Sequence, residues 1–200
     1  MRAPRLLRGP GLHLGRARAT VAAAALAVYV GSIAGANWMI SHLGEAIGAS
    51  RYLPVGFGLH APSGVYMAAL TFVARDVVQR LAGTRAGVAA IAAGAAISWW
   101  ISTPVLAVAS GVTFLVSESC DFLVFTPLQA RAFPLAVVAS GLVGDVVDST
   151  LFLTLAGIPL SVALPGQLLG KAWVMLAGGL LAALLRQTGP FRLPAAAVTQ

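Results

Sequence analysis

Six long apolar segments follow one another along the chain, separated by short connections that carry polar residues. A helix needs about 20 apolar residues to cross a hydrocarbon core of about 30 Å, so the pattern predicts an all-α integral membrane bundle of six transmembrane helices. Segments 61–74 and 104–116 are short for this distance, and we expect part of each to continue into an adjoining charged segment. The expected spans are Ala19–Ile40, Ala61–Ala74 (with an earlier start near Val55 as an option), Gly87–Ile101, Pro104–Val116, Phe133–Gly157 and Gly166–Leu185.

The composition supports a membrane protein. Of the 200 residues 58% are hydrophobic and 10% are charged, against about 25% charged residues in soluble domains, so lipid is expected to cover much of the surface. The formal charge of +7 is spread over tails and loop ends without an interleaved aromatic stripe, and we expect no nucleic acid partner. The single Cys120 excludes an intrachain disulfide and a multi-cysteine metal site. His42 and His60, with no third ligand, are a poor metal signal, and no cofactor is expected.

The basic residues also predict an orientation. Arginines gather in the N-terminal tail, after the second span, after the fourth span and in the C-terminal tail, whereas the opposite connections hold only Arg51. By the positive-inside rule we expect a protein of the plasma (inner) membrane with both termini in the cytoplasm. Its expected parts are a basic cytoplasmic tail (1–18), a six-span membrane domain (19–186) and a second cytoplasmic tail (187–200). A cleaved signal peptide ending at SIAGA is the alternative, but the apolar run continues beyond that point.

Two carboxylates stand inside the apolar run AFPLAVVASGLVGDVVDSTLFLTLAG. Asp145 and Asp148 are three residues apart and share one helical face, with Ser140 near it. An acid near mid-membrane usually faces a protein-lined cavity and serves a polar ligand or ion, and two adjacent acids require a proton or a cation. Hydration near a span end is the alternative. Lys171, the only lysine, either neutralises one of these acids or extends to the interface.

Two further polar groups lie at the predicted cytoplasmic span ends. Glu118 and Asp121 are three residues apart in SESCDF, and we expect a nearby arginine, Arg131, as a partner or hydration at a helix end. In ARDVVQR, the spacing of Asp76 and Arg80 suits an i,i+4 ion pair. A structural role of this segment at the interface is favoured over ligand contact.

The first span ends in an amide and an indole, Asn37 and Trp38. An amide side chain offers both a donor and an acceptor for the edge of a heterocycle, and an indole offers a face for a flat ring. Trp38 also fits the interfacial aromatic belt. The connection 41–62 contains glycines and prolines that exclude one continuous helix. Its segment VGFGL is interpreted either as a membrane-dipping lid or as an ordinary structured loop.

Several stretches, in this order, resemble the VUT family of vitamin uptake transporters, also known as queuosine precursor transporters: ANWMISHLG, LPVGFGLHAPSGVYMAALTFVARDVVQRLAG, SESCDFLVFTPLQAR and ASGLVGDVVDSTLFLTLAG. The resemblance covers roughly 36–157. It implies a six-helix bundle related to the substrate-binding components of energy-coupling-factor transporters, with a 7-deazaguanine as cargo. It implies site positions at Arg75, Asp76, Glu118, Asp121, Ser140 and Asp148. Asp145 looks like an addition to the family pattern, and the family's arginine cluster after SESCDF is reduced here to Arg131.

The residues therefore predict a membrane transporter for a small planar solute, a 7-deazaguanine by resemblance. The chain has no GxxxxGK[ST] motif, so ATP hydrolysis would come from a partner ATPase module, whereas protonation of the aspartates would couple uptake to a proton gradient. A substrate-binding subunit for another vitamin-like solute is the alternative. An intramembrane enzyme is disfavoured because GLVGD has the wrong glycine spacing for an aspartyl protease, and a membrane scaffold is the remaining hypothesis.

Overall fold

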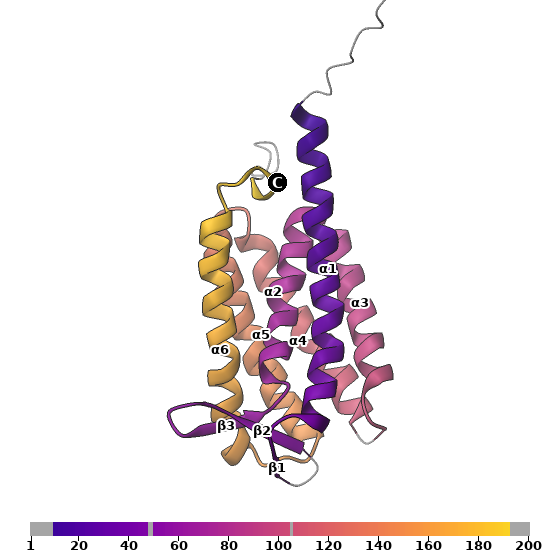
Figure 1. The fold of residues 1–200 in the computed structure, drawn as a ribbon, viewed down its shortest axis with the longest axis vertical. Helices are drawn as coiled ribbons and strands as arrows, with labels where there is room; N and C mark the ends of the chain where they lie inside the picture. The colour runs from indigo at the N-terminus through magenta and orange to yellow at the C-terminus, as the bar shows by residue number, and fades with distance from the viewer. Residues whose placement is uncertain (1–9, 48–49, 105, 193–200) are drawn as a thin grey trace, which may run out of the picture.

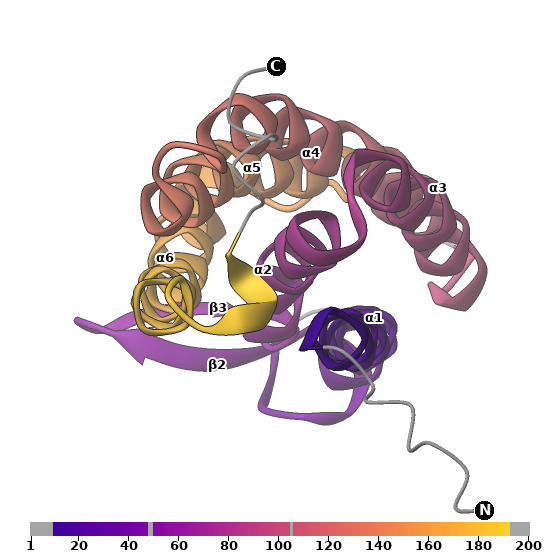
Figure 2. The same ribbon diagram turned by 90° about the horizontal axis from the view of Figure 1, so that it is seen from above.

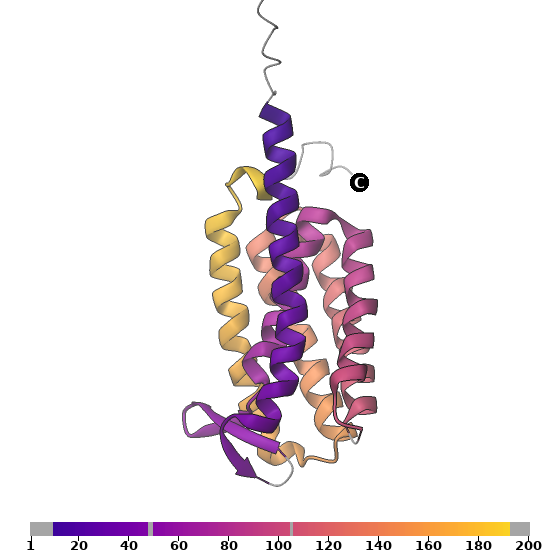
Figure 3. The same cartoon turned by 45° about the vertical axis from the view of Figure 1, so that its right-hand side comes forward.

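The computed structural model describes residues 10–47, 50–104 and 106–192, and within them six α-helices form one bundle beside a small sheet (Figure 1). The helices run nearly parallel to the long axis of the molecule, and the sheet lies across the end opposite to the start of the first helix (Figure 3). The elements are α1 (Pro10–His42), β1 (Glu45–Ile47), β2 (Ser50–Gly56), β3 (Leu59–Pro62), α2 (Val65–Ala82), α3 (Thr84–Ile101), α4 (Ala107–Leu128), α5 (Phe133–Leu155), α6 (Leu160–Leu185) and the 3-10 helix η1 (Gly189–Phe191).

Five of these helices are long and apolar enough to cross a membrane: α1, α3, α4, α5 and α6. Each carries large apolar side chains that are exposed to the surroundings, for example Leu123 of α4 (70% exposed) and Leu184 of α6 (69% exposed). So many exposed large apolar side chains are typical of a surface covered by lipid or by another apolar partner. The chain is thus a mainly helical, multi-pass membrane protein, as the apolar pattern predicted.

The remaining helix, α2, lies at the centre of the bundle and is surrounded by the other five (Figure 2). Twelve of its 18 residues are buried, although it carries Arg75, Asp76 and Arg80. Because the neighbouring helices separate α2 from lipid, its charged residues need partners inside the protein rather than in water. The least apolar helix is therefore the most enclosed one.

Two helices extend through the charged segments that follow their apolar runs, as expected from the short lengths of those runs. Helix α2 continues through Arg80 to Ala82, and α4 continues through Glu118 and Asp121 to Leu128. The alternative of a hydrated helix end for the two α4 acids is wrong, because both are 0% exposed in the interior of a 22-residue helix. The interface location expected for ARDVVQR is wrong in the same way for Arg75 and Asp76, which are also 0% exposed.

The bounds of two other helices differ from the predicted spans. Helix α1 begins at Pro10, inside the segment 1–18 that was expected to be a tail, because arginine and alanine are good helix formers and continue the helix without an apolar pattern. Helix α6 begins at Leu160, before the expected Gly166, and contains Pro165 in its second turn. Pro165 lies beyond the four free N–H groups of the first turn, so it removes one intrahelical donor, but the helix continues through it to Leu185.

The connection between α1 and α2, predicted as an irregular loop or lid, contains an antiparallel sheet in the order β1-β2-β3. Strands β2 and β3 are joined by the two-residue turn Phe57-Gly58, in which both φ angles are positive (52° and 73°), the conformation typical of tight hairpins. Phe57 is 85% exposed at the tip. These strands were not predicted from the sequence, because prolines and glycines interrupt the alternation of polar and apolar residues every few positions.

The sheet is held against the bundle by close backbone contacts. Trp173 of α6 donates its indole N–H to the Val55 carbonyl (3.1 Å), and the Ser63 hydroxyl donates to the Met39 carbonyl (2.6 Å). At Gly166 a Cβ atom would lie 2.0 Å from the His60 carbonyl oxygen. Glycine at this position therefore permits β3 to pack directly on α6.

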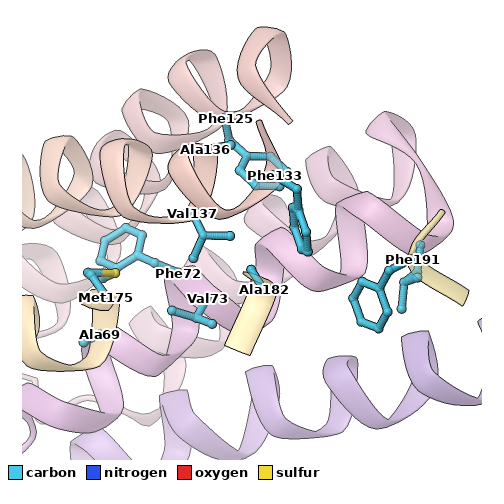
Figure 4. Close-up of a cluster of buried hydrophobic side chains, with 11 residues drawn as sticks. Ala69, Phe72, Val73, Phe125, Phe133, Ala136, Val137, Met175, Ala182 and Phe191 are labelled. Atoms are coloured by element: carbon cyan, nitrogen blue, oxygen red, sulfur yellow. The ribbon is translucent and has the colours of Figure 1, made fainter. Parts of the chain in front are cut away.

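The largest apolar core cluster extends from Ala69, Phe72 and Met175 in the middle of the bundle to Phe191 of η1 (Figure 4). Toward η1, Phe133 packs edge-to-face on Phe125 and stacks on Phe191, with ring centroids 6.4 Å and 5.9 Å apart respectively. A void between α2, α5, α6 and η1 has a volume of about 20 Å³, room for one water molecule at most. This end of the bundle is closed by packing.

Candidate functional site

A cavity lies between the helices in the half of the bundle nearer the sheet, with a volume of about 110 Å³. A buried water molecule needs roughly 10–15 Å³ of such space, so the cavity holds several waters or a small organic molecule. All six helices contribute to its wall. The lining residues that carry the argument are Asn37, Phe72, Thr113, Asp148, Gln167 and Lys171.

One wall of the cavity carries an ion-paired cluster formed by α5 and α6. Lys171 Nζ lies 2.6 Å from Asp148 Oδ2 and 3.3 Å from Asp145 Oδ1, and it donates to Ser149 Oγ at 2.7 Å. The Lys171 and Asp145 side chains are 1% and 2% exposed, whereas the Asp148 side chain is 17% exposed at the cavity. Asp148 is thus the acid of this cluster that a solute entering the cavity can reach.

The remaining cavity wall is largely apolar, with a few polar groups. Phe72, Phe114 and Phe152 supply aromatic surface. The Thr113 hydroxyl is buried and has no hydrogen-bond partner within the described part of the chain, so it is free to bind a ligand or water in the cavity. Asn37 is held in place, because its amide donates to the Ile33 carbonyl (3.0 Å) and accepts from Ser102 (2.8 Å).

A second charged cluster surrounds Arg75 between α2 and α4. Its guanidinium Nε donates to Glu118 Oε2 at 2.9 Å, and Nη2 lies 2.9 Å from Asp121 Oδ1 and 3.1 Å from Asp76 Oδ1. The face of Phe125 lies 5.7 Å from the guanidinium carbon. All four charged side chains are at most 1% exposed, and none of them lines the cavity. We call these four residues, Arg75, Asp76, Glu118 and Asp121, the Arg75 cluster.

Polar side chains lead from the cavity toward the Arg75 cluster and beyond it. The Ser117 hydroxyl donates to Asp148 Oδ1 at 3.2 Å, and Ser117 directly precedes Glu118 in α4. On the other side, Arg75 Nη1 donates to Gln79 Oε1 (2.8 Å), and the Gln79 amide donates to Thr126 (2.9 Å). Polar groups therefore line the centre of the bundle from the cavity to the last turn of α4.

The residues predicted to form one site are divided between these places. Asn37 and Asp148 line the cavity, and Asp145 lies behind Asp148. Arg75, Glu118 and Asp121 belong to the Arg75 cluster, and Ser140 lies 3.5 Å from its Asp76 Oδ2. Trp38 is placed outside the cavity: it is 57% exposed and stacks on His42 with ring centroids 5.0 Å apart. An exposed indole near the helix end fits the interfacial role.

Two expected ion pairs are wrong. Arg131 is exposed and pairs with neither α4 acid, because Arg75 occupies that position instead. Arg80 does not pair with Asp76. Its guanidinium donates to the backbone carbonyls of Gln129 and Phe191, since Asp76 turns toward Arg75 in the bundle interior.

The sequence left the role of Lys171 open, and the structure gives it to the acids of α5. A signal for this role existed, because a lone lysine within an apolar run needs a counter-charge if it does not reach the interface. Gln167 and Thr113 were not singled out as cavity residues. Gln167 lies four residues before Lys171 and shares its helical face, and this was the signal that could have found it. Thr113 carries no such signal, because a lone hydroxyl in an apolar run does not indicate which helix it faces.

A scan against protein-family models, a search of curated proteins and a search of solved structures find no match to this chain.

Proposed function

We propose that this protein is a membrane transporter for a small planar solute, a 7-deazaguanine of the kind used as a queuosine precursor. The observation that carries the proposal is the cavity inside an apolar bundle, with the Lys171–Asp148 pair on one wall and phenylalanine rings on another. Buried ionisable groups beside a cavity are expensive in a membrane protein and typically mark a solute pathway. The resemblance of stretches between residues 36 and 157 to the VUT family supplies the identity of the cargo.

The cavity chemistry matches a guanine-type edge. Such an edge presents a carbonyl acceptor next to a ring N–H and an exocyclic amine, both of which are donors. The Asp148 carboxylate, 17% exposed, would accept charge-assisted hydrogen bonds from the ring N–H and the amine, while Lys171, 2.6 Å away, holds it in place. The rings of Phe72, Phe114 and Phe152 would border the planar faces, in a pocket of mainly apolar lining with few polar groups.

The arrangement also supports movement across the membrane. The cavity lies near the sheet end, while the opposite end is closed by the core around Phe133. The basic connections favour a cytoplasmic position for the closed end, and in that orientation this conformation would receive solute from outside. Opening of the packed end would then release the solute inward, in an alternating-access cycle.

A binding assay on the purified full-length protein tests the proposal. We expect 7-cyano-7-deazaguanine or its aminomethyl relative, within a panel of nucleobases and vitamins, to raise the melting temperature. Asp148→Asn removes one charge-assisted partner, and such bonds are worth about 1.5–3 kcal/mol, so affinity should fall roughly 10- to 100-fold. Thr150→Val, on the exposed face of the same helix, is the matched control and should bind normally.

Uptake of the labelled deazaguanine by cells or proteoliposomes should follow the same order. Equal affinity and uptake in Asp148→Asn and wild type would remove the role of the cavity acid. Stabilisation by a different member of the panel, with no response to deazaguanines, would refute the cargo while retaining the transporter. Conversion of the ligand to a product would indicate an enzyme instead.

A further inference from the structure

The Arg75 cluster carries more negative than positive charge in a place that water does not reach. Three carboxyl groups surround one guanidinium, and their side chains are at most 1% exposed. Among the described residues, no cation other than Arg75 forms an ion pair with these carboxyl groups. If all three acids were ionised, the cluster would have a net charge of −2. Unpaired charge in the interior of a protein is strongly unfavourable and is usually removed by neutralising the group.

The hydrogen bonding of the cluster gives an independent indication. Glu118 Oε1 and Asp121 Oδ2 are buried atoms without a hydrogen-bond partner, and neither forms one of the ion pairs with Arg75, which involve Oε2 and Oδ1. Buried carboxylate oxygens nearly always have partners, because an unsatisfied acceptor costs the full desolvation energy. These two oxygens are therefore the positions at which a proton would bind.

We infer that the Arg75 cluster is a proton-binding site and that it couples solute movement to a proton gradient. The inference rests on the proposed transport function, which it deepens by naming the energy source. Protonation forms an O–H bond at a Glu118 or Asp121 oxygen with a proton taken from water. Release breaks the same bond and returns the proton to water at the other side of the membrane. The process consumes no oxidant, reductant or nucleotide.

The geometry links this site to the cavity. Asp148, whose second oxygen binds Lys171, accepts a hydrogen bond from Ser117, the residue before Glu118. A solute that binds to Asp148 and Lys171 changes the hydrogen bonds of Ser117 and hence the position of the α4 turn that carries Glu118. Loading of the cavity and protonation of the cluster thus act on the same turn.

A second line of polar groups leads from the cluster to the closed end. Arg75 binds Gln79, and Gln79 binds Thr126. Chains of hydrogen-bonding side chains with water are the usual proton routes within membrane bundles. Opening of the packed end would connect this line to the cytoplasm.

Other charged or titratable residues lie on the surrounding helices, and a pH experiment has to distinguish their effects from those of the Arg75 cluster. On α2 the neighbouring cation is Arg80, which binds backbone carbonyls. On α1 the Tyr29 hydroxyl donates to the Ala90 carbonyl of α3 at 2.9 Å. On α5 and α6 the ionisable groups are Asp145, Asp148 and Lys171, which pair with one another.

The decisive experiment uses the full-length protein in proteoliposomes with labelled 7-cyano-7-deazaguanine. A gradient that is acidic outside should drive accumulation, by about tenfold for each coupled proton and each pH unit. Exchange of labelled for unlabelled solute at equal pH is measured in the same vesicles, because exchange needs binding and conformational change but no gradient. In Glu118→Gln and in Asp121→Asn, the ratio of gradient-driven to exchange uptake should fall to that of vesicles without a gradient. Glu45→Gln, at an exposed acid in β1, is the matched control and should keep the wild-type ratio.

The two proposals fail in different ways. Absence of exchange in the wild type refutes the cargo, whereas exchange without a response to the pH gradient refutes proton coupling. Accumulation driven by a sodium gradient at constant pH, or only in the presence of an ATPase module, would also overturn the inference.

A measurement without cargo keeps the inference testable if the solute is a different one. A protonated carboxyl group has an infrared C=O band that ionised carboxylates lack. The purified protein near neutral pH should show this band, and it should lose intensity in Asp121→Asn or Glu118→Gln but not in Glu45→Gln. A wild-type protein without the band would refute the proton-binding site directly.

Discussion

Removal of the Lys171 ammonium is the sharpest test of the charge arrangement in the bundle. Lys171 Nζ contacts two carboxylates, at 2.6 Å and 3.3 Å, and its side chain is 1% exposed. Lys171→Met keeps most of the apolar volume of the side chain but leaves Asp145 and Asp148 without a cation. Breaking a buried ion pair by removing one partner costs about 3–5 kcal/mol, because the remaining charge is uncompensated.

The expected loss lies at the lower limit of that range. Asp148 is 17% exposed, and water in the cavity will stabilise part of its charge after the substitution. We therefore expect Lys171→Met to cost about 3 kcal/mol. For chains of this size 1 kcal/mol shifts the melting temperature by roughly 2–4 °C, so the shift should be about 6–12 °C, measured by intrinsic tryptophan fluorescence in detergent.

A second substitution, Asp145→Asn, added to Lys171→Met separates this charge effect from loss of packing. In Lys171→Met/Asp145→Asn only one acid remains without a partner, so at least half of the lost stability should return. Arg85→Met, at an exposed position of α3, is the control and should change stability by no more than about 0.5 kcal/mol. If Lys171→Met melts within about 2 °C of wild type, or if the double variant is no more stable than the single one, the proposed pairing is refuted.

Two further predictions concern packing. Gly166→Ala would place a Cβ 2.0 Å from the His60 carbonyl oxygen and should lower stability by about 1–3 kcal/mol through overpacking. The control Gly31→Ala, with nothing within 4 Å of its Cβ, should be neutral or stabilising by up to about 1 kcal/mol. Equal melting temperatures of the two variants would contradict this account of the sheet contact. Tyr29→Phe removes the hydrogen bond to the Ala90 carbonyl and should cost about 1–2 kcal/mol, because that carbonyl stays buried. An unchanged melting temperature would mean that the carbonyl finds another partner.

The division of the predicted site is the main functional consequence of the fold. The acids of α4 and α5 were all candidates for one solute site, yet Asp148 borders the cavity while Glu118 and Asp121 are enclosed with Arg75. We propose that the first binds solute and that the second binds protons. Separate but linked sites are what coupled transport requires, since each ligand must bias the same conformational change.

Amino-acid pattern alone was sufficient for the helices, the multi-pass class and the pairs of acids that share a helical face. Long apolar runs have few stable alternatives in lipid, where a backbone must satisfy its own hydrogen bonds, and three-residue spacing places Asp145 beside Asp148 on any helix.

Tertiary structure decided which helices face one another. In a soluble bundle the apolar stripe of each helix indicates its inner face, but here lipid and core are equally apolar, so that signal is absent. The position of α2 at the centre, the approach of Lys171 to the α5 acids and the contact of Arg75 with Glu118 all depend on helix order and rotation. These are set by the packing of many small contacts between distant segments, which no local spacing in the sequence specifies.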